Sequence, residues 1–342
     1  MMLLSKTGLA VIRFSWASFN EKNFTKYEEG LRLIERQPVI AGVGHCCQDH
    51  ICTVEQYPPE DGSTHILSID DSQGGGAVAT ALAAASRLGA KACLLARLGD
   101  DSTGDKILRG LAADGVDVAL VSRVPGGRSS ASYVMVNPET GSRTKFPYRD
   151  NLPPITFSAA ERRAIAGADA LHLDGTRYEN ALNAAKIARE AGTLVSLDGC
   201  SRQADNRLNL ELAAMADILV MNAAYPFRVS GLDDREEALR FMAALGTPRV
   251  VMMTAGADGV YAVAGGKVHH YPAFQVRAVD TTGAGDVFHG AFLTRWLETE
   301  DTEESIRFAQ AAAALKCLRP GGRAGIPDRG QLTAFLRSQS SL

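Results

Sequence analysis

The sequence predicts an α/β protein in which two layers of helices enclose a mostly parallel central sheet, with a smaller β-sheet beside it. Three observations lead to this fold class. Short apolar runs alternate with helical stretches through most of the chain, two β-rich segments interrupt that order, and a glycine-rich turn precedes an apolar helix near the C-terminus. Strand–helix alternation at this spacing is typical of three-layer α/β/α sandwiches, whose parallel strands are buried on both faces.

The first 37 residues differ from the rest of the chain. They combine scattered basic and aromatic residues with little periodicity, and the first acidic residue is Glu21. An organellar presequence and an upstream start codon are both compatible with this composition, and we expect a poorly ordered arm. The folded domain is predicted to span 39–342, because the apolar run 38–44 is typical of a buried strand.

Helices and strands then alternate along the chain. Helices are predicted at 76–89, 103–114, 178–191 and 234–245. Strands are predicted at 92–96, 116–121, 170–173, 194–197, 218–221 and 249–253. Ligands of parallel sheets bind beyond the carboxyl ends of the strands, and four polar residues fall just after an apolar run, at that edge: Asp49, Asp174, Asp198 and Asn222.

The segments 52–72 and 125–149 break this alternation. Both contain β-type residues and turns, and together they are predicted to form a small sheet that covers the strand edge as a lid. Such a lid would exclude water from a group-transfer reaction. Ordinary surface hairpins are the alternative.

The turn at 283–286 carries the strongest chemical signal. Gly283 and Gly285 allow a ligand to approach the backbone closely, and Asp286 opens a helix whose stripe includes Phe288 and Phe292. A helix N-terminus suits an anion, so a carboxylate at its rim is explained if it accepts a proton from an attacking hydroxyl. A routine N-cap is the alternative.

Composition and the remaining motifs exclude several classes. The chain has 342 residues, 46% of them hydrophobic, with a net charge of −3 and no Lys/Arg-rich run, so we expect no nucleic-acid partner. No apolar run approaches the roughly 18 residues of a membrane span, so we expect no membrane partner. The run 42–47 lacks the third glycine of a dinucleotide motif, and 265–268 lacks the spacing of a P-loop. Cys93 and Cys317 lie in apolar contexts, which favours reduced thiols and a cytoplasmic location.

The segment from Asp280 to Gly290 resembles the C-terminal signature of the ribokinase-like sugar kinases, the pfkB carbohydrate kinase family. Further similarity covers about 39–330, including the segments 97–104 and 254–259. The resemblance implies a ribokinase-like fold and an ATP-dependent kinase that uses Mg²⁺. The run 316–327 is similar to the corresponding end of sulfofructose kinases, although Ser63 and Pro147 differ from that subgroup.

The resemblance also implies roles for individual residues. Asp286 would be the general base for a primary sugar hydroxyl, and the turn of Gly283, Ala284 and Gly285 would form the anion hole. Implied substrate-binding residues are Asp49, Gly75, Gly76 and Thr80. Implied ATP-binding residues are Asn222, Thr254, Gly256 and Gly259. A monovalent cation such as K⁺ would lie at Asp280, Thr282 and Gly322, where a structural turn is the alternative.

Some residues depart from the family pattern. Thr80 stands where the family often has Asn, and Tyr225 replaces a Glu that helps to organise Mg²⁺. Cys200 and Arg202 follow Asp198 in a partial match to Asp-x-Asn-x-Arg. Arg177 follows a strand and suits an anionic group on the substrate, with a solvent-facing role as the alternative.

Three functions therefore remain open. The first is an ATP-dependent kinase of a sugar or sugar derivative that can be anionic. The second is a nucleoside kinase of the same fold, and the third is a non-catalytic protein that binds a ligand or partner. Lids of this kind often pair between subunits, so a homodimer formed through the lid is also expected.

Overall fold

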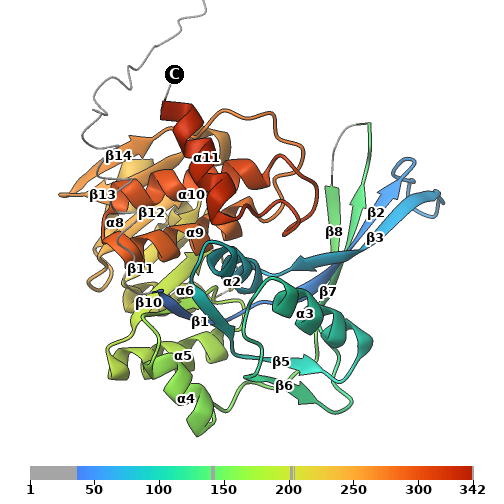
Figure 1. Cartoon of the computed structure of the whole chain (residues 1–342), viewed down its shortest axis with the longest axis horizontal. Coiled ribbons are helices and arrows are strands. Elements are labelled where there is room, and N and C mark those ends of the chain that lie inside the picture. Colours follow the sequence, from blue (N-terminus) through green and yellow to red (C-terminus); the bar gives the residue numbers. More distant parts are fainter. Residues whose placement is uncertain (1–36, 140–142, 201–202, 204, 341–342) are drawn as a thin grey trace, which may run out of the picture. The chain divides into compact units, whose positions relative to one another are not determined.

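The computed structural model describes residues 37–342 except 140–142, 201–202, 204 and 341–342, so nearly all of the expected N-terminal arm and Arg202 lie outside the described residues. Residues 37–342 form one compact unit. It contains an eight-stranded sheet, a four-stranded sheet and a two-stranded ribbon (Figure 1). No helix in this described part of the chain has the length and hydrophobicity to cross a membrane.

The eight-stranded sheet has the order β14-β13-β12-β11-β10-β9-β1-β4. Its parallel strands are β1 (Val39–Val43), β4 (Lys91–Leu94), β9 (Ala170–Leu173), β10 (Leu194–Gly199), β11 (Ile218–Asn222) and β12 (Val250–Thr254). The strands β13 (Val260–Ala264) and β14 (Lys267–Tyr271) continue it antiparallel at one edge. The predicted three-layer fold with a mostly parallel sheet is confirmed.

Helices cover both faces of this sheet. The helices are α2 (Ala77–Arg87), α3 (Ser102–Ala113), α4 (Ala159–Ala166), α5 (Tyr178–Ala191), α6 (Asn206–Met215), α7 (Tyr225–Ser230), α8 (Arg235–Ala243), η1 (Gly256–Asp258), α9 (Ala284–Thr299), α10 (Thr302–Lys316) and α11 (Arg329–Ser340). Ala41 and Val43 join a core with α5 to α8, whereas Gly42 between them faces α2. Alternate residues of a strand therefore serve opposite helical layers.

Helices α2 and α9 approach each other closely at Gly290. A Cβ added there would lie 2.0 Å from the carbonyl oxygen of Ala81 on α2. Gly290 is therefore required for packing, since any larger residue would push the two helices apart. This contact fixes the helix that begins at Gly283 against the one that begins at Gly76.

The four-stranded sheet contains β2 (Cys47–Val54), β3 (Ile66–Gly75), β7 (Ala131–Val136) and β8 (Arg143–Tyr148), in the order β3-β2-β7-β8. The two β-rich segments do pair with each other, as predicted. The sheet is longer than the predicted range 52–72, because β2 begins at Cys47 and β3 continues to Gly75. It projects from the helical body at the right of Figure 1. We call it the lid sheet.

The predicted strand at 116–121 was wrong. Asp117 makes only an isolated bridge to Cys93, and the chain then turns before β6 (Val121–Val124), which pairs with β5 (Ala96–Gly99). The Asp117 carboxylate accepts the N–H of Ala119 at 2.9 Å, and the Val121 N–H donates to the Val118 carbonyl at 3.0 Å. An aspartate side chain that satisfies the backbone locally offers an alternative to the strand ladder.

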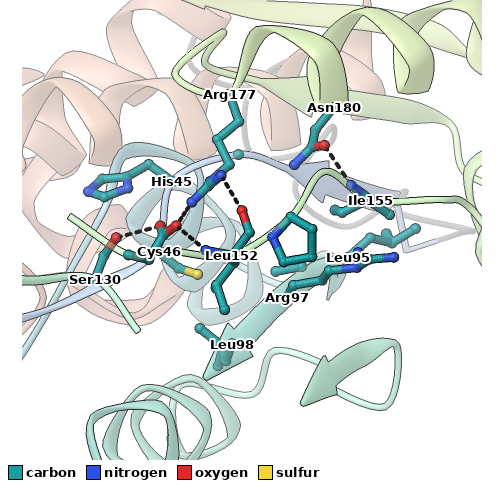
Figure 2. A pocket seen from close by; sticks show the side chains of 14 residues that line it. His45, Cys46, Leu95, Arg97, Leu98, Ser130, Leu152, Ile155, Arg177 and Asn180 are labelled. Atoms are coloured by element: carbon teal, nitrogen blue, oxygen red, sulfur yellow. Dashed lines mark hydrogen bonds and ion pairs between the residues drawn. The ribbon is translucent and has the colours of Figure 1, made fainter. Parts of the chain in front are cut away.

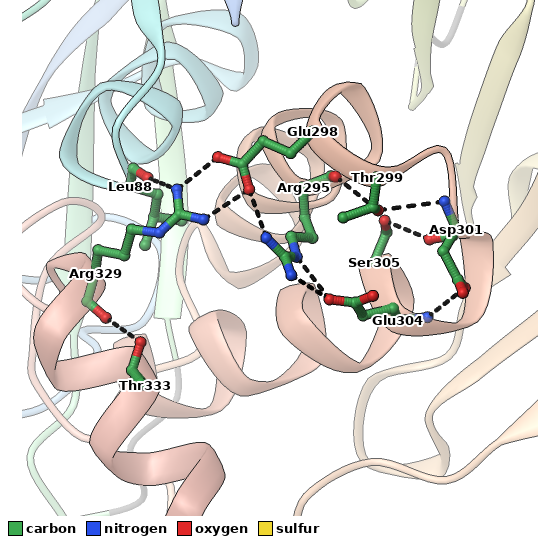
Figure 3. Close-up of polar contacts among 9 residues, drawn as sticks. All are labelled: Leu88, Arg295, Glu298, Thr299, Asp301, Glu304, Ser305, Arg329 and Thr333. Atoms are coloured by element: carbon green, nitrogen blue, oxygen red, sulfur yellow. Dashed lines mark hydrogen bonds and ion pairs between the residues drawn. The ribbon is translucent and has the colours of Figure 1, made fainter. Parts of the chain in front are cut away.

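A buried ion-pair network ties the C-terminal helices together (Figure 3). Arg295 on α9 is fully buried and pairs with Glu298 at 2.8 Å and with Glu304 on α10. Arg329 on α11 binds Glu298 through two nitrogens, at 2.5 and 2.6 Å, and also donates to the Leu88 carbonyl at 2.9 Å. Each charge in this network therefore has an opposite partner.

Candidate active site

A cavity of about 310 Å³ lies between the lid sheet and the starts of α2 and α9. It brings together eight of the residues singled out from the sequence: Asp49, Gly75, Gly76, Thr80, Thr282, Gly283, Asp286 and Gly322. These residues come from opposite ends of the sequence. The expected sugar-facing residues and the expected general base thus line one cavity.

Gly283 sets the start of α9. Its φ of 76° is left-handed, and a Cβ there would lie 2.9 Å from the Gly322 carbonyl oxygen. Both constraints favour glycine. Its carbonyl accepts the Val287 N–H at 2.9 Å, which closes the first helical turn. A helix start leaves N–H groups without intrahelical partners, and such groups can bind an anion, although the Ala284 N–H already donates to the Thr281 carbonyl at 3.2 Å.

The Asp286 carboxyl group is poised to take up a proton near neutral pH. Burial, followed by the negative charge of Asp198, raises its pKa from 3.8 to about 6. A general base works best when its pKa lies near the working pH. The side chain nevertheless lines the cavity, so a substrate can reach it.

A buried His–Asp pair lies behind Asp286. His289 Nε2 on α9 is 3.3 Å from an Asp198 oxygen at the end of β10, and both side chains are buried. Burial alone would raise the pKa of Asp198, but the charge and hydrogen bond of His289, together with His172 and Cys200, outweigh it and the pKa falls. Burial opposes a charged His289, yet the charge of Asp198 raises its pKa. His289 is packed, as the sequence indicated, and it is also the side-chain partner of Asp198.

His172 completes the buried polar group on this face of the sheet. Its ring lies 5.5 Å from that of His289, and its Nδ1 is 3.2 Å from the Ser196 hydroxyl. Complete burial lowers its pKa to about 3, so it is neutral. Of the two histidines, His289 is therefore the one whose pKa is raised.

The expected sugar side of the cavity is built around Gly75 and Gly76, the glycine pair. Asp49 on β2 is buried, and burial raises its pKa. A Cβ at Gly75 would lie 2.5 Å from an Asp49 oxygen, so glycine is needed there. Arg323, whose role the sequence did not reveal, is buried and donates to the Gly75 carbonyl at 2.8 Å. Thr80 lies on α2 and is also buried.

Two basic residues, one in strand β8 of the lid sheet and one just after it, also line this cavity. Lys145 on β8 lowers the pKa of both Asp49 and Asp286 through its positive charge. Arg149 follows the same strand. Lys145 was not among the residues predicted from the sequence to line the site. Strand alternation could have identified it: Lys145 and Pro147 are two residues apart in β8, so both side chains lie on the cavity side of the strand.

Arg177 lines a different and much smaller cavity, of about 20 Å³ (Figure 2). It forms an ion pair with Asp150 and donates to the Leu152 carbonyl at 3.2 Å. The two cavities share His45 and Ser130 in their walls. The structure therefore does not bring Arg177 into the cavity of Asp286.

The residues expected to bind ATP lie along the neighbouring strands. Asn222 ends β11 and is the register partner of Thr254, which ends β12; Gly256 and Gly259 bound the short helix η1 that follows. None of them lines the cavity of Asp286. Tyr225 is buried, and its hydroxyl donates to the Asn209 carbonyl at 3.3 Å. Among the described residues, no group of three His, Cys, Asp or Glu side chains is arranged to hold a metal ion.

Two protein cations occupy the place expected for a monovalent ion. Arg143 from the lid sheet binds the Asp280 carboxylate and the Thr282 hydroxyl, and it donates to Thr281 at 3.1 Å. The Lys316 ammonium donates to the Asp280 carbonyl at 2.8 Å. Gly322 lies beside Gly283 across this loop.

Comparison with known proteins agrees with this geometry. The model of the pfkB family carbohydrate kinases matches residues 38–329. The chain is 33% identical to an ATP-dependent ribose-1-phosphate kinase of Halopiger xanaduensis, over 87% of this chain and 97% of that protein. It is 30% identical to a ribokinase of Haemophilus influenzae, over 86% and 97%.

Solved structures give the same result for the fold. The ribokinase of Arabidopsis thaliana, solved with ribose and ATP, superposes with a TM-score of 0.78 at 26% identity and covers 88% of this chain and 99% of its own. None of these three relatives is named as a sulfofructose kinase, so the resemblance of 316–327 to that subgroup stays a prediction. The chain belongs to the pfkB family of carbohydrate kinases and has the ribokinase-like fold.

Proposed function

We propose that the protein transfers the γ-phosphate of ATP to a primary hydroxyl of a sugar or sugar derivative, with Asp286 as general base. The observation that carries this proposal is the position of Asp286. Its carboxylate, with a pKa of about 6, lies at a helix start in the cavity that also holds Asp49 and the glycine pair. A carboxylate beside an anion site is favourable when it accepts a proton during the attack.

In this mechanism Asp49 orients the substrate and Asp286 removes the proton from its attacking oxygen. The N–H groups of the turn 283–286 stabilise the charge on the transferring phosphoryl group, and a positioned base contributes about 10²- to 10⁴-fold. Asn222, Thr254, Gly256 and Gly259 would bind the nucleotide. Magnesium bound to ATP would supply positive charge to the phosphates, and it would rely on phosphate and water oxygens here because Tyr225 offers no carboxylate.

Two positive side chains favour an anionic sugar. Lys145 and Arg149 line the cavity, and Lys145 affects the electrostatics of both Asp49 and Asp286. The relative from Halopiger xanaduensis is named for a sugar phosphate. Arg177 was the residue first expected to bind such a group. Since Asp150 pairs with it, Lys145 is the better candidate.

Two alternatives stay open. A nucleoside kinase is the first, because a nucleoside kinase of Methanothermobacter thermautotrophicus is 29% identical over 88% of this chain. A non-catalytic binding protein is the second, on account of Tyr225 and Thr80. The intact Asp286 argues against it, since ligand binding alone does not require a base.

We also propose a homodimer formed through the lid sheet. Its outer face presents Tyr133, which stacks on His50, and the neighbouring Phe146; Tyr133 is 44% exposed and Phe146 54%. Clustered exposed aromatic side chains are typical of interfaces.

The six free cysteines support a reducing, cytoplasmic location.

A substrate panel tests the proposed reaction. The protein is incubated with ATP, Mg²⁺ and neutral sugars, sugar phosphates, sulfo-sugars or nucleosides, and ADP formation is followed. We expect turnover with one sugar class and its loss in Asp286→Asn. If no compound gives turnover above this variant, the kinase proposal is wrong, and preference for nucleosides would favour the first alternative.

A further inference from the structure

Lys316 is a buried cation that the proposed reaction does not use directly. It is the last residue of α10, and its side chain is completely buried. Its Nζ donates to the main-chain carbonyl of Asp280 at 2.8 Å. A buried ammonium is costly unless it has partners, so its position on this loop needs an explanation.

The loop that receives this hydrogen bond leads directly into the anion hole. The N–H groups of Val279 and Asp280 both donate to the Cys317 carbonyl, at 2.7 and 3.1 Å. The Asp280 carboxylate accepts the N–H groups of Thr282 at 2.8 Å and of Gly321 at 2.9 Å. Asp280 therefore connects the start of α9 with the segment that follows α10.

The Asp280 carboxylate also interacts with the positively charged side chains near this loop. Burial would raise the pKa of Asp280, but its hydrogen bonds and the charge of Lys316 lower it to about 2, so the group is ionised. Burial lowers the pKa of Lys316, and the negative charge of Asp280 opposes that effect. Arg143 binds the same carboxylate from the lid sheet. The carboxylate is thus neutralised by protein groups alone.

The residues here do not fit the monovalent cation that the family resemblance implies. Such an ion needs several oxygen ligands, yet the Asp280 carbonyl already accepts a hydrogen bond from Lys316. A carboxyl oxygen of Asp280 and the Thr282 hydroxyl are bound by Arg143. A K⁺ ion would meet two positive charges at this place, which disfavours its binding.

We infer that the Lys316 ammonium takes the place of a monovalent cation and holds the anion-hole loop through the Asp280 carbonyl. The fixed charge lies at the end of α10 and cannot dissociate. The loop is therefore organised without K⁺, and both stability and turnover are independent of it. The effect on turnover rests on the proposed function, but the effect on stability does not.

Thermal unfolding tests the inference without any assumption about activity. The wild type is unfolded in KCl, NaCl and choline chloride at equal ionic strength. We expect the same midpoint in all three, within about 1 °C. A midpoint several degrees higher in KCl than in choline chloride would show that the wild type binds K⁺ and would overturn the inference.

The variant Lys316→Ala supplies the opposite case, because it removes the ammonium and leaves room for an ion. We expect its midpoint in choline chloride to fall by about 5 °C, and K⁺ to restore part of the loss. Lys267→Ala, at an exposed lysine of β14, is the control and should show neither effect. If Lys316→Ala unfolds as the wild type does, with no loss and no response to K⁺, the ammonium has no such role. If it does not fold, the wild-type comparison alone decides.

The same salts are then compared in the kinase assay. We expect the wild-type rate to change less than twofold, whereas Lys316→Ala should lose about tenfold or more in choline chloride and recover in KCl. K⁺ activation of the wild type would contradict the inference. Absence of turnover with every substrate would count against the proposed function, while the unfolding result would still decide the role of Lys316.

Discussion

The two ends of helix α9 hold buried charge in opposite ways. At its C-terminal end, Arg295 and Arg329 meet Glu298 and Glu304, and each charge has an opposite partner. At its N-terminal end, Asp286 lies near Asp198 and Asp174, and His289 is paired with Asp198. We call these the balanced and the acidic cluster.

The pKa values reflect this difference. Burial and the neighbouring carboxylates raise the pKa of Asp286 to about 6, and burial also raises that of Asp174. In the balanced cluster, opposite charges outweigh the burial of Arg295 and raise its pKa. Matched charges hold helices together, whereas at the other end of α9 the neighbouring acids on and after the strands raise the pKa of Asp286. Charge imbalance thus marks the end of the helix where we propose catalysis.

The largest expected effect comes from neutralising the acidic cluster. Asp286→Asn should lower kcat by about 10²- to 10⁴-fold, because it removes the base. It should also stabilise the protein at pH 7 by roughly 1–2 kcal/mol, since a carboxylate whose pKa is raised by folding is strained when ionised. Turnover and urea unfolding measure the two effects. A variant that loses both activity and stability would place Asp286 among structural residues.

The balanced cluster should respond in the opposite sense. Glu298→Gln leaves the buried Arg295 and the partly buried Arg329 without their shared carboxylate and should lower the free energy of unfolding by about 3 kcal/mol. Turnover per folded molecule should stay within about twofold of wild type. Glu236→Gln, which breaks an exposed pair with Arg240 on α8, is the control and should cost less than about 0.5 kcal/mol. Equal losses in the two variants would remove the distinction between buried and exposed pairs.

The pH dependence of turnover sharpens the contrast. Asp286 must be deprotonated to act, and its pKa in the folded protein is about 6. We therefore expect kcat/KM to fall about tenfold for each pH unit below that value. The sign for stability is the reverse: the destabilising contribution of Asp286 is present above pH 6 and disappears toward pH 4, as the group becomes protonated. A kcat/KM that stays level down to about pH 5 would contradict Asp286 as the base.

The smallest expected effect concerns the lid cation beside the acidic cluster. Lys145 lowers the pKa of Asp286, so Lys145→Met should move the acidic limb of the pH profile upward by less than about one unit. Lys267→Met, on an exposed lysine of β14, should leave the limb unchanged. A shift of the limb toward lower pH would contradict the conclusion that Lys145 lowers the pKa of Asp286.

The sequence predicted those parts of the molecule whose signals are local. The helix at 178–191 was found at its observed bounds, because its apolar periodicity is followed by Gly192, whose φ is 78°. The cavity role of Asp286 followed from the glycines beside it. The strand at 116–121 was wrong because apolar residues gave a strand pattern, while the Asp117 side chain formed a turn.

Other residues gave no local signal. Lys316 lies in an alanine-rich helix and meets Asp280 only in the folded protein. Asp198 and His289 pair across the interface between β10 and α9, and Arg323 reaches Gly75 from the far end of the chain. Contacts between distant segments depend on the completed packing, so periodicity and spacing cannot predict them.

The junction between the central sheet and the lid sheet has a mechanical consequence. Strand β1 continues into β2 through residues 44–46, and β3 continues into α2 through Gly76, whose φ is 95°. Gly44 leaves no space for a side chain beside Asp174 and Val78. His45 and the glycine pair Gly75 and Gly76 lie in these two connections and also line the cavity. A ligand in the cavity would therefore contact the connections themselves, and we expect it to restrict rotation of the lid sheet about them.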